Sequence, residues 1–155
     1  MAELKPTAAE TRLARELVGT WRLVSCEHRR ADGTIEYPFG AAPSERLVYT
    51  PEGRMIVLIT DPGRPLARSP QFFEAQDAEL APAAKGCVAY SGLWRLRGGK
   101  VVHEVEQSLF PNWTGHALVR MADLKDGRLT LSTGVFKIGA AKYTAALVWE
   151  KEARP

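Results

Sequence analysis

Residues 87–113 read CVAYSGLWRLRGGKVVHEVEQSLFPNW, and this stretch decides the fold. Two strand-like runs in it flank Gly98-Gly99, which is typical of a tight hairpin turn between antiparallel strands. The second run ends in a different kind of connection, Ser108-Leu109-Phe110-Pro111-Asn112-Trp113. A loop that only reversed the chain would not need two large aromatic side chains, so we expect this one to cover or line something.

The rest of the chain repeats this alternation of short and long connections. Strand-like runs are expected at residues 19–30, 45–50, 54–60, 87–97, 100–108, 114–124, 128–133 and 142–151. Tight turns follow every second run, and long loops follow the others. In an up-and-down meander all the long loops then lie at one end, and eight strands close most simply into a barrel. We therefore predict an all-β fold, an eight-stranded antiparallel up-and-down β-barrel whose elaborated mouth favours a ligand site.

Two helices are expected beside the barrel. Thr7 and Glu10 have the spacing of a capping box, and Leu13 and Leu17 follow at helical spacing, which predicts a short N-terminal helix packed on the barrel. A second helix is expected at about residues 71–84, inserted between the third and fourth strands. No repeat or low-complexity linker divides the sequence, so we expect a single domain over residues 1–155.

The composition is that of an ordinary globular protein, with 155 residues, 45% hydrophobic side chains and a formal charge of +3 at pH 7. Lys and Arg are interspersed with Asp and Glu, which indicates a solvated surface and no nucleic-acid partner. The sequence has two cysteines, no apolar signal segment and no membrane span, so we expect a cytoplasmic protein with free thiols. The spacing of the three histidines does not suit a metal site, and no cofactor is expected.

Several short motifs together resemble the bacterial lipocalin-like domain family. They are Gly19-Thr20-Trp21, LVYTPEG at residues 47–53, YSGLW at 90–94, SLFPNW at 108–113 and LVW at 147–149. The resemblance implies a barrel with Trp21 inside its closed end, covered by a basic side chain such as Lys151 or Arg154. Related barrels carry hydrophobic molecules or act as isomerases and cyclases in small-molecule biosynthesis. The inserted helix, the lack of a signal segment and the lack of an expected disulfide distinguish this sequence from secreted lipocalins.

Strand alternation predicts which side chains face the barrel interior, with Trp21 taken to point inward. In the first strand Ser25 and Glu27 then face inward, and Cys26 faces outward. Glu27 lies nearest the mouth, where a carboxylate is either solvated and paired with an arginine or takes part in catalysis.

The fourth and fifth strands contribute the larger interior side chains. In the fourth strand the bulkier and less charged face holds Tyr90 and Trp94. In the fifth strand two glutamates two positions apart belong in water, which turns His103 and Gln107 inward. His103 either makes structural hydrogen bonds or acts as an acid or base, because its ordinary pKa is close to neutral.

The sixth strand leaves two alternatives open. Either the face with His116 and Arg120 or the opposite face points inward. An inward Arg120 would pair with a ligand carboxylate, whereas an outward one would extend along the surface into water.

The expected cavity is apolar and aromatic with few polar groups, and it fits a small, mostly hydrophobic ligand with one polar or anionic end. The predicted ligand-binding residues are Tyr90, Trp94, His103, Gln107, Phe110, Asn112, Trp113 and Arg120. The candidates for catalysis are His103 and Glu27, and no nucleophile motif is present. The function classes are therefore a small-molecule binding protein, a cyclase or isomerase that uses the same cavity, and a filled barrel that works as a protein-interaction module.

Overall fold

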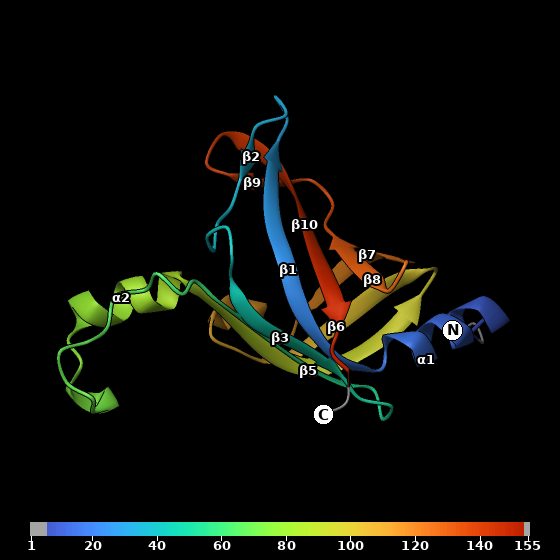
Figure 1. Cartoon of the computed structure of the whole chain (residues 1–155), viewed down its shortest axis with the longest axis horizontal. Coiled ribbons are helices and arrows are strands. Elements are labelled where there is room, and N and C mark those ends of the chain that lie inside the picture. The colour runs from blue at the N-terminus through green and yellow to red at the C-terminus, as the bar shows by residue number, and fades with distance from the viewer. Residues whose placement is uncertain (1–5, 154–155) are drawn as a thin grey trace.

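Each long strand pairs with an antiparallel neighbour and the last returns to the first, so the sheet closes into a barrel. The computed structural model describes residues 6–153 (Figure 1). In spatial order the barrel strands are β1 (Gly19–Arg30), β3 (Ser44–Tyr49), β4 (Arg54–Thr60), β5 (Cys87–Arg97), β6 (Lys100–Ser108), β7 (Ala117–Lys125), β8 (Arg128–Ser132) and β10 (Ala141–Lys151). The predicted eight-stranded antiparallel barrel is confirmed.

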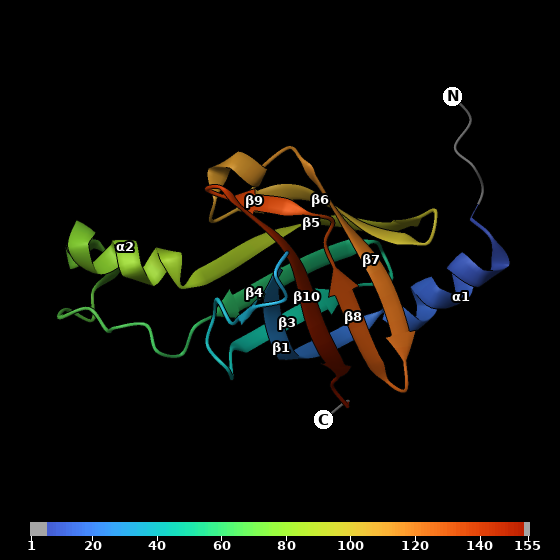
Figure 2. The ribbon, with the colours of Figure 1, turned by 90° about the horizontal axis from the view of Figure 1, so that it is seen from above.

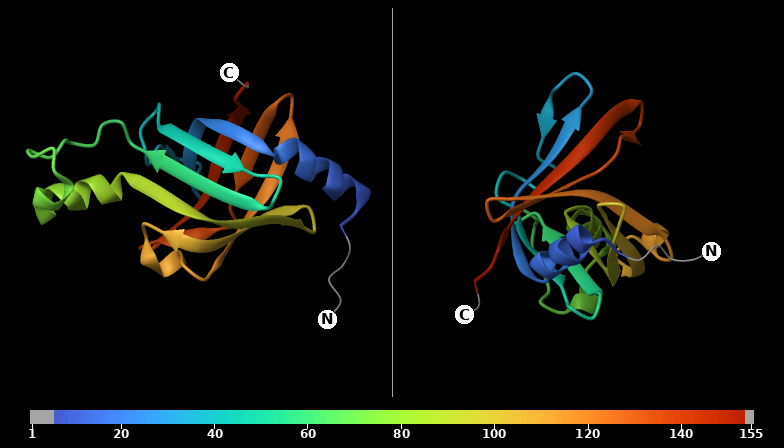
Figure 3. Two further views of the ribbon diagram at one scale, coloured as in Figure 1. Left: turned by 90° about the horizontal axis from the view of Figure 1, so that it is seen from below. Right: turned by 90° about the vertical axis from the view of Figure 1, so that its right-hand side faces the viewer.

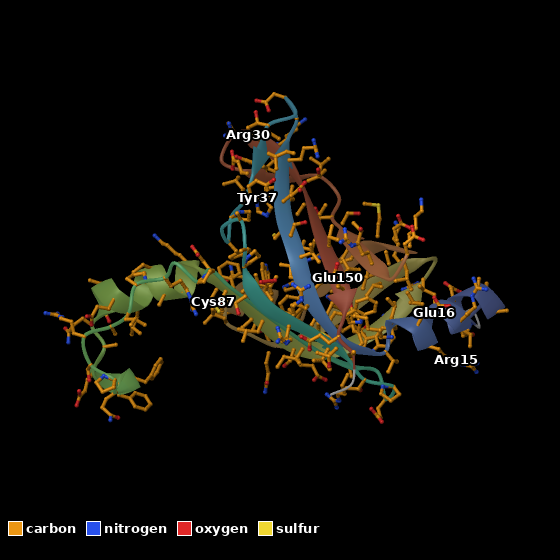
Figure 4. All side chains as sticks on the ribbon, viewed as in Figure 1. Arg15, Glu16, Arg30, Tyr37, Cys87 and Glu150 are labelled. Carbon is orange, nitrogen blue, oxygen red and sulfur yellow. The ribbon has the colours of Figure 1, made fainter. Side chains whose placement is uncertain are left out.

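Two short strands that the sequence did not predict extend the barrel at its mouth. β2 (Ile35–Glu36) pairs with β1, and β9 (Phe136–Ile138) pairs with β10. Segments this short show no alternation, so no pattern marks them. β1 and β10 rise beyond the other strands with β2 and β9 beside their tips (Figure 1), and Arg30 marks the tip of β1 (Figure 4). The mouth of the barrel is therefore higher on the side of β1 and β10 than elsewhere.

A β-bulge in β1 reverses the predicted alternation of its upper half. Leu23 pairs with Trp149, but Ser25 pairs with Val148, so β1 carries one extra residue between these pairs. An extra residue exchanges the two faces of the strand beyond it. Cys26 is buried instead of exposed, and the prediction that Ser25 and Glu27 face the interior is wrong.

A second bulge, in β6, has the same effect. Ser91 pairs with Gln107 and Gly92 with Val105, which leaves Glu106 as the extra residue. Gly92 permits this bulge, because a Cβ atom there would lie 1.9 Å from the backbone oxygen of Glu104. Gln107 is consequently turned to the exposed outer face, and its predicted inward orientation is wrong.

The predicted N-terminal helix is α1 (Ala8–Leu17), and it lies at the closed end of the barrel, toward the viewer in the right-hand panel of Figure 3. The capping box is confirmed: the Glu10 N–H donates to Thr7 Oγ1 over 3.1 Å, and the Thr7 N–H donates to Glu10 Oε2 over 2.9 Å. Leu17 is fully buried. No helix within residues 6–153 is both long and apolar enough to cross a membrane.

Trp21 closes the barrel above α1, as the resemblance implied. Its indole N–H donates to the Leu17 carbonyl over 2.8 Å, and Lys151 Nζ lies 5.2 Å from the ring centroid. Lys151 Nζ also donates to the carbonyl of Glu16 over 2.6 Å, whereas Arg154 lies outside the described residues. Gly19 makes room for this contact, since its φ is +138° and a Cβ atom would lie 2.8 Å from Lys151 Cε. Helix, tryptophan and lysine therefore seal one end.

The predicted second helix is shorter than expected and projects away from the barrel (Figures 1 and 2). It consists of the 3₁₀ turn η1 (Phe72–Glu74) and α2 (Asp77–Lys85). We call residues 61–86 the arm. Phe72 and Phe73 of η1 are 70% and 97% exposed, and Cys87 lies where the arm joins β5 (Figure 4).

Candidate ligand cavity

The barrel encloses a cavity of about 530 Å³ that is walled mainly by apolar side chains. Its lining residues are Cys26, His28, Phe39, Leu47, Val57, Ile59, Val88, Tyr90, His103, Trp113, Val119, Arg120, Leu131, Thr133, Gly134, Val135, Phe136, Ala145, Leu147 and Trp149. Ligand sites usually have a volume of a few hundred cubic ångströms. The interior is therefore not filled, which removes the basis for the third predicted function class, the filled barrel.

Three neutral aromatic side chains form a hydrogen-bonded row within the barrel wall. His103 on β6 is 1% exposed. Its Nε2 lies 2.6 Å from the hydroxyl of Tyr49 on β3, and its Nδ1 lies 3.0 Å from the hydroxyl of Tyr90 on β5. Each of these three residues lies in a strand-like segment, and no sequence motif links the three segments. The folding of the barrel brings the three side chains together.

Burial controls the charge of this row. It lowers the pKa of His103 to about 3, and the nearby positive charge of Arg120 acts in the same direction. Burial also raises the pKa of Tyr49 and of Tyr90, while Arg120 opposes both increases. All three side chains are therefore uncharged at neutral pH.

Arg120 supplies the only formal positive charge among the described lining residues, and none of them is acidic. It is half-buried on the same face of β7 as Leu118 and Ala122, which pack against the hydrophobic core. Val119 and Met121 on the other face are 45% and 46% exposed, although Val119 also borders the cavity. This decides between the two alternatives for β7: the face with Arg120 points inward.

His28 and Phe136 form the upper rim of the cavity, and the ring of Tyr143 lies against Phe136 outside the lining. The His28 ring contacts the edge of Phe136 at a centroid distance of 5.3 Å, and Phe136 stacks on Tyr143 at 5.9 Å. Burial lowers the pKa of His28. The sequence did not predict this rim, because the bulge in β1 turns His28 inward and the short strand β9 positions Phe136.

The loop at residues 108–113 contributes one wall of the cavity through Trp113. The ring of Trp113 is perpendicular to that of Tyr90, with centroids 5.8 Å apart, and it contacts Phe110 at 5.6 Å. A second, smaller cavity of about 300 Å³ lies on the other side, lined by Phe110, Trp113 and residues at the root of the arm. Trp113 therefore separates the two cavities.

The structure divides the predicted ligand-binding residues into two groups. Those that line the main cavity are Tyr90, His103, Trp113 and Arg120. Those that lie elsewhere are Trp94, Gln107, Phe110 and Asn112.

Each residue of the second group has a different position. Trp94 is buried below the cavity, and its Nε1 donates to the carbonyl of Thr50 over 3.1 Å. Gln107 and Asn112 are exposed, and Phe110 lines the smaller cavity. Glu27, the second candidate for catalysis, lies outside the cavity lining with a carboxylate oxygen 3.8 Å from Arg29 Nη2.

The closed barrel, the sealed end and the internal cavity define a lipocalin-like protein. A profile of the family described as lipocalin-like domain matches residues 18–152, and the chain belongs to this family. The 4'-hydroxy-3'-methoxypropiophenone carrier protein ppsC of Aspergillus oryzae is 32% identical over 106 residues, which are 63% of this chain and 96% of that protein. An uncharacterised protein from Bacteroides eggerthii, solved as a crystal structure, is 12% identical, with a TM-score of 0.42 over 84% of this chain and 98% of that one.

Proposed function

We propose that this protein binds a small, mostly apolar molecule in the barrel cavity and carries it unchanged. The observation that supports the proposal most directly is the cavity of about 530 Å³, with apolar walls and a polar wall of Tyr90, His103 and Arg120 on three adjacent strands. Such a combination is usual for small-molecule sites. The name of the Aspergillus oryzae relative describes a carrier of an aromatic ketone, which is a ligand of fitting size and polarity.

The chemistry of the cavity favours binding over catalysis. A general acid or base works best when its pKa is near the working pH, but burial lowers the pKa of His103 to about 3. Both ring nitrogens of His103 are also occupied by tyrosine hydroxyls. Glu27, the other candidate for the cyclase or isomerase alternative, lies outside the cavity lining.

The test is to fill the cavity by a single substitution. Ala145 on β10 is 5% exposed and lines the cavity, so Ala145→Phe should occupy ligand space. We expect the variant to lose at least about tenfold in affinity for an apolar fluorescent dye and for 4'-hydroxy-3'-methoxypropiophenone, since a ring there displaces part of the ligand. The affinities for both compounds are measured by fluorescence titration or calorimetry.

Ala146→Phe is the matched control, because Ala146 follows on the same strand and is not a lining residue. It should bind both compounds as the wild type does. Equal binding by the two variants would contradict a site inside the barrel. Mass spectrometry of each compound after incubation with the protein separates a carrier, which returns it unchanged, from an enzyme.

A further inference from the structure

In the hydrogen-bonded row of Tyr49, His103 and Tyr90, the number of protons determines which side chain donates each hydrogen bond and which accepts it. A neutral imidazole carries one N–H donor and one acceptor nitrogen. His103 has a tyrosine hydroxyl on each nitrogen. One tyrosine must therefore donate to the ring, and the other must accept from it.

The surroundings of the two tyrosines indicate which one donates. Tyr49 is 1% exposed, and within residues 6–153 His103 is the one hydrogen-bond partner of its hydroxyl. If Tyr49 accepted from Nε2–H, its own proton would be buried without an acceptor, which is unfavourable. Tyr49 therefore donates to Nε2, and Nδ1–H donates to the oxygen of Tyr90.

This direction leaves the hydroxyl proton of Tyr90 free to point into the cavity, which Tyr90 lines. Arg120 also lines the cavity, its Nη1 donates to the Val119 carbonyl over 3.0 Å, and its positive charge opposes the rise in the pKa of Tyr90. A guanidinium can only donate hydrogen bonds. Neither Arg120 nor the Nδ1–H of His103 can therefore accept the proton of Tyr90, which is directed toward a ligand.

One further polar side chain of the cavity, that of Thr133, also offers a donor. The hydroxyl of Thr133 accepts the Ala145 N–H over 2.9 Å, which leaves the Thr133 proton available. Since no acidic side chain is among the described lining residues, an oxygen of the ligand is the fitting acceptor for these donors.

We propose that the cavity selects molecules by an acceptor oxygen, a carbonyl or a carboxylate, which accepts a hydrogen bond from the Tyr90 hydroxyl and is attracted by the positive charge of Arg120. Tyr49 and His103 are positioning residues that keep the Tyr90 proton directed at the ligand. The inference rests on the proposed function, because it names the ligand class of the same cavity.

The selectivity is tested with propiophenone and propylbenzene, which differ only in that a carbonyl replaces a methylene group. We expect the wild type to bind propiophenone at least about tenfold more tightly, although propylbenzene is the more hydrophobic. Tyr90→Phe should bring the ratio of the two affinities close to one. Tyr37→Phe is the matched control, because Tyr37, just after β2 (Figure 4), is 49% exposed and is not a lining residue of the cavity.

A ratio near one in the wild type, or an unchanged ratio in Tyr90→Phe, would overturn the proposal. Replacing propiophenone by 3-phenylpropanoate distinguishes an anionic acceptor from a neutral one. If the site prefers the anion, Arg120→Gln should reduce the affinity for 3-phenylpropanoate more than the affinity for propiophenone. Failure of every one of these compounds to bind would contradict the proposed function as well.

The direction of the row is tested separately, without any ligand. In a ¹⁵N NMR spectrum at pH 7, His103 should carry its proton on Nδ1, with Nε2 unprotonated. The opposite tautomer would overturn the role of Tyr49 as donor. Tyr49→Phe should lower the preference for propiophenone while leaving propylbenzene affinity unchanged, whereas a merely structural role would weaken both.

Discussion

Two buried titratable side chains make the stability of the barrel depend on pH in opposite directions. Glu45 is 4% exposed, and neither of its carboxylate oxygens has a hydrogen-bond partner within the described residues. His103 is 1% exposed and held between two tyrosines. Each group prefers its neutral form in the folded state, because burial disfavours charge.

For Glu45, burial raises the pKa to about 7, against the smaller opposing effects of Arg46 and Arg22. The folded state therefore keeps a proton that the unfolded state loses near pH 4.5, so this group reduces stability as the pH rises from about 4.5 to 7. We predict that Glu45→Gln increases the free energy of unfolding by roughly 1–3 kcal/mol at pH 8, and by much less at pH 5. Urea unfolding at the two pH values measures the difference. Glu27→Gln, at a carboxylate that is 30% exposed beside Arg29, is the surface control.

For His103, stability depends on pH in the opposite direction. The unfolded side chain takes up a proton near pH 6.5, but the folded one does so only near pH 3. Its contribution to stability is complete above pH 6.5 and decreases as the pH falls toward 3. In the Glu45→Gln background, we predict a decrease of about 2 kcal/mol in the free energy of unfolding between pH 7 and pH 5 from His103 alone. His28, whose pKa burial also lowers, adds to this decrease. Stability that does not change between these two pH values would contradict a buried, neutral His103.

At the scale of the strand, the two bulges decide which side chains reach the cavity. The bulge in β1 brings Cys26 and His28 inward, and the bulge in β6 turns Gln107 outward. Alternation of apolar and polar residues predicts a strand but not a single inserted residue within it. Gly92 was the available signal for the second bulge, because a glycine inside a strand pattern often marks one. Nothing comparable marks the bulge in β1.

The close approach at Gly92 gives a direct test of the β6 bulge. Gly92→Ala would place a Cβ atom 1.9 Å from the backbone oxygen of Glu104, so β5 and β6 would have to separate. We predict a loss of about 2–4 kcal/mol in the free energy of unfolding. Gly134→Ala is the control, since a Cβ atom there meets nothing within 4 Å, and its effect should stay within about 0.5 kcal/mol. Equal effects of the two substitutions would argue against the bulge geometry.

At the scale of the whole molecule, the sequence predicted the barrel well and the site only in part. Strand periodicity and turn chemistry are local, so the hairpin at Gly98-Gly99 and the order of the strands follow directly from them. The row of Tyr49, His103 and Tyr90 depends instead on barrel closure and on strand register. The rim at His28 and Phe136 additionally depends on a bulge and on a three-residue strand. Such long-range placements leave no periodic pattern in the sequence.

The projecting arm contributes little to the hydrophobic core of the barrel. We predict that replacing residues 66–80 by a short Gly-Ser linker changes the melting temperature by no more than about 4 °C, because the exposed Phe72 and Phe73 add nothing to the barrel core. Thermal unfolding followed by near-ultraviolet circular dichroism measures this, and dye binding shows whether the main cavity is retained. Loss of the cooperative transition would show that the arm supports the barrel.

The two ends of the arm meet, since the Asp61 N–H donates to the Gly86 carbonyl over 2.9 Å, directly beyond the paired residues Thr60 and Cys87. The chain thus leaves and re-enters the barrel at a single point. We therefore expect that a longer segment, a folded domain or a reporter inserted between Asp61 and Gly86 leaves every strand pairing of the barrel unchanged.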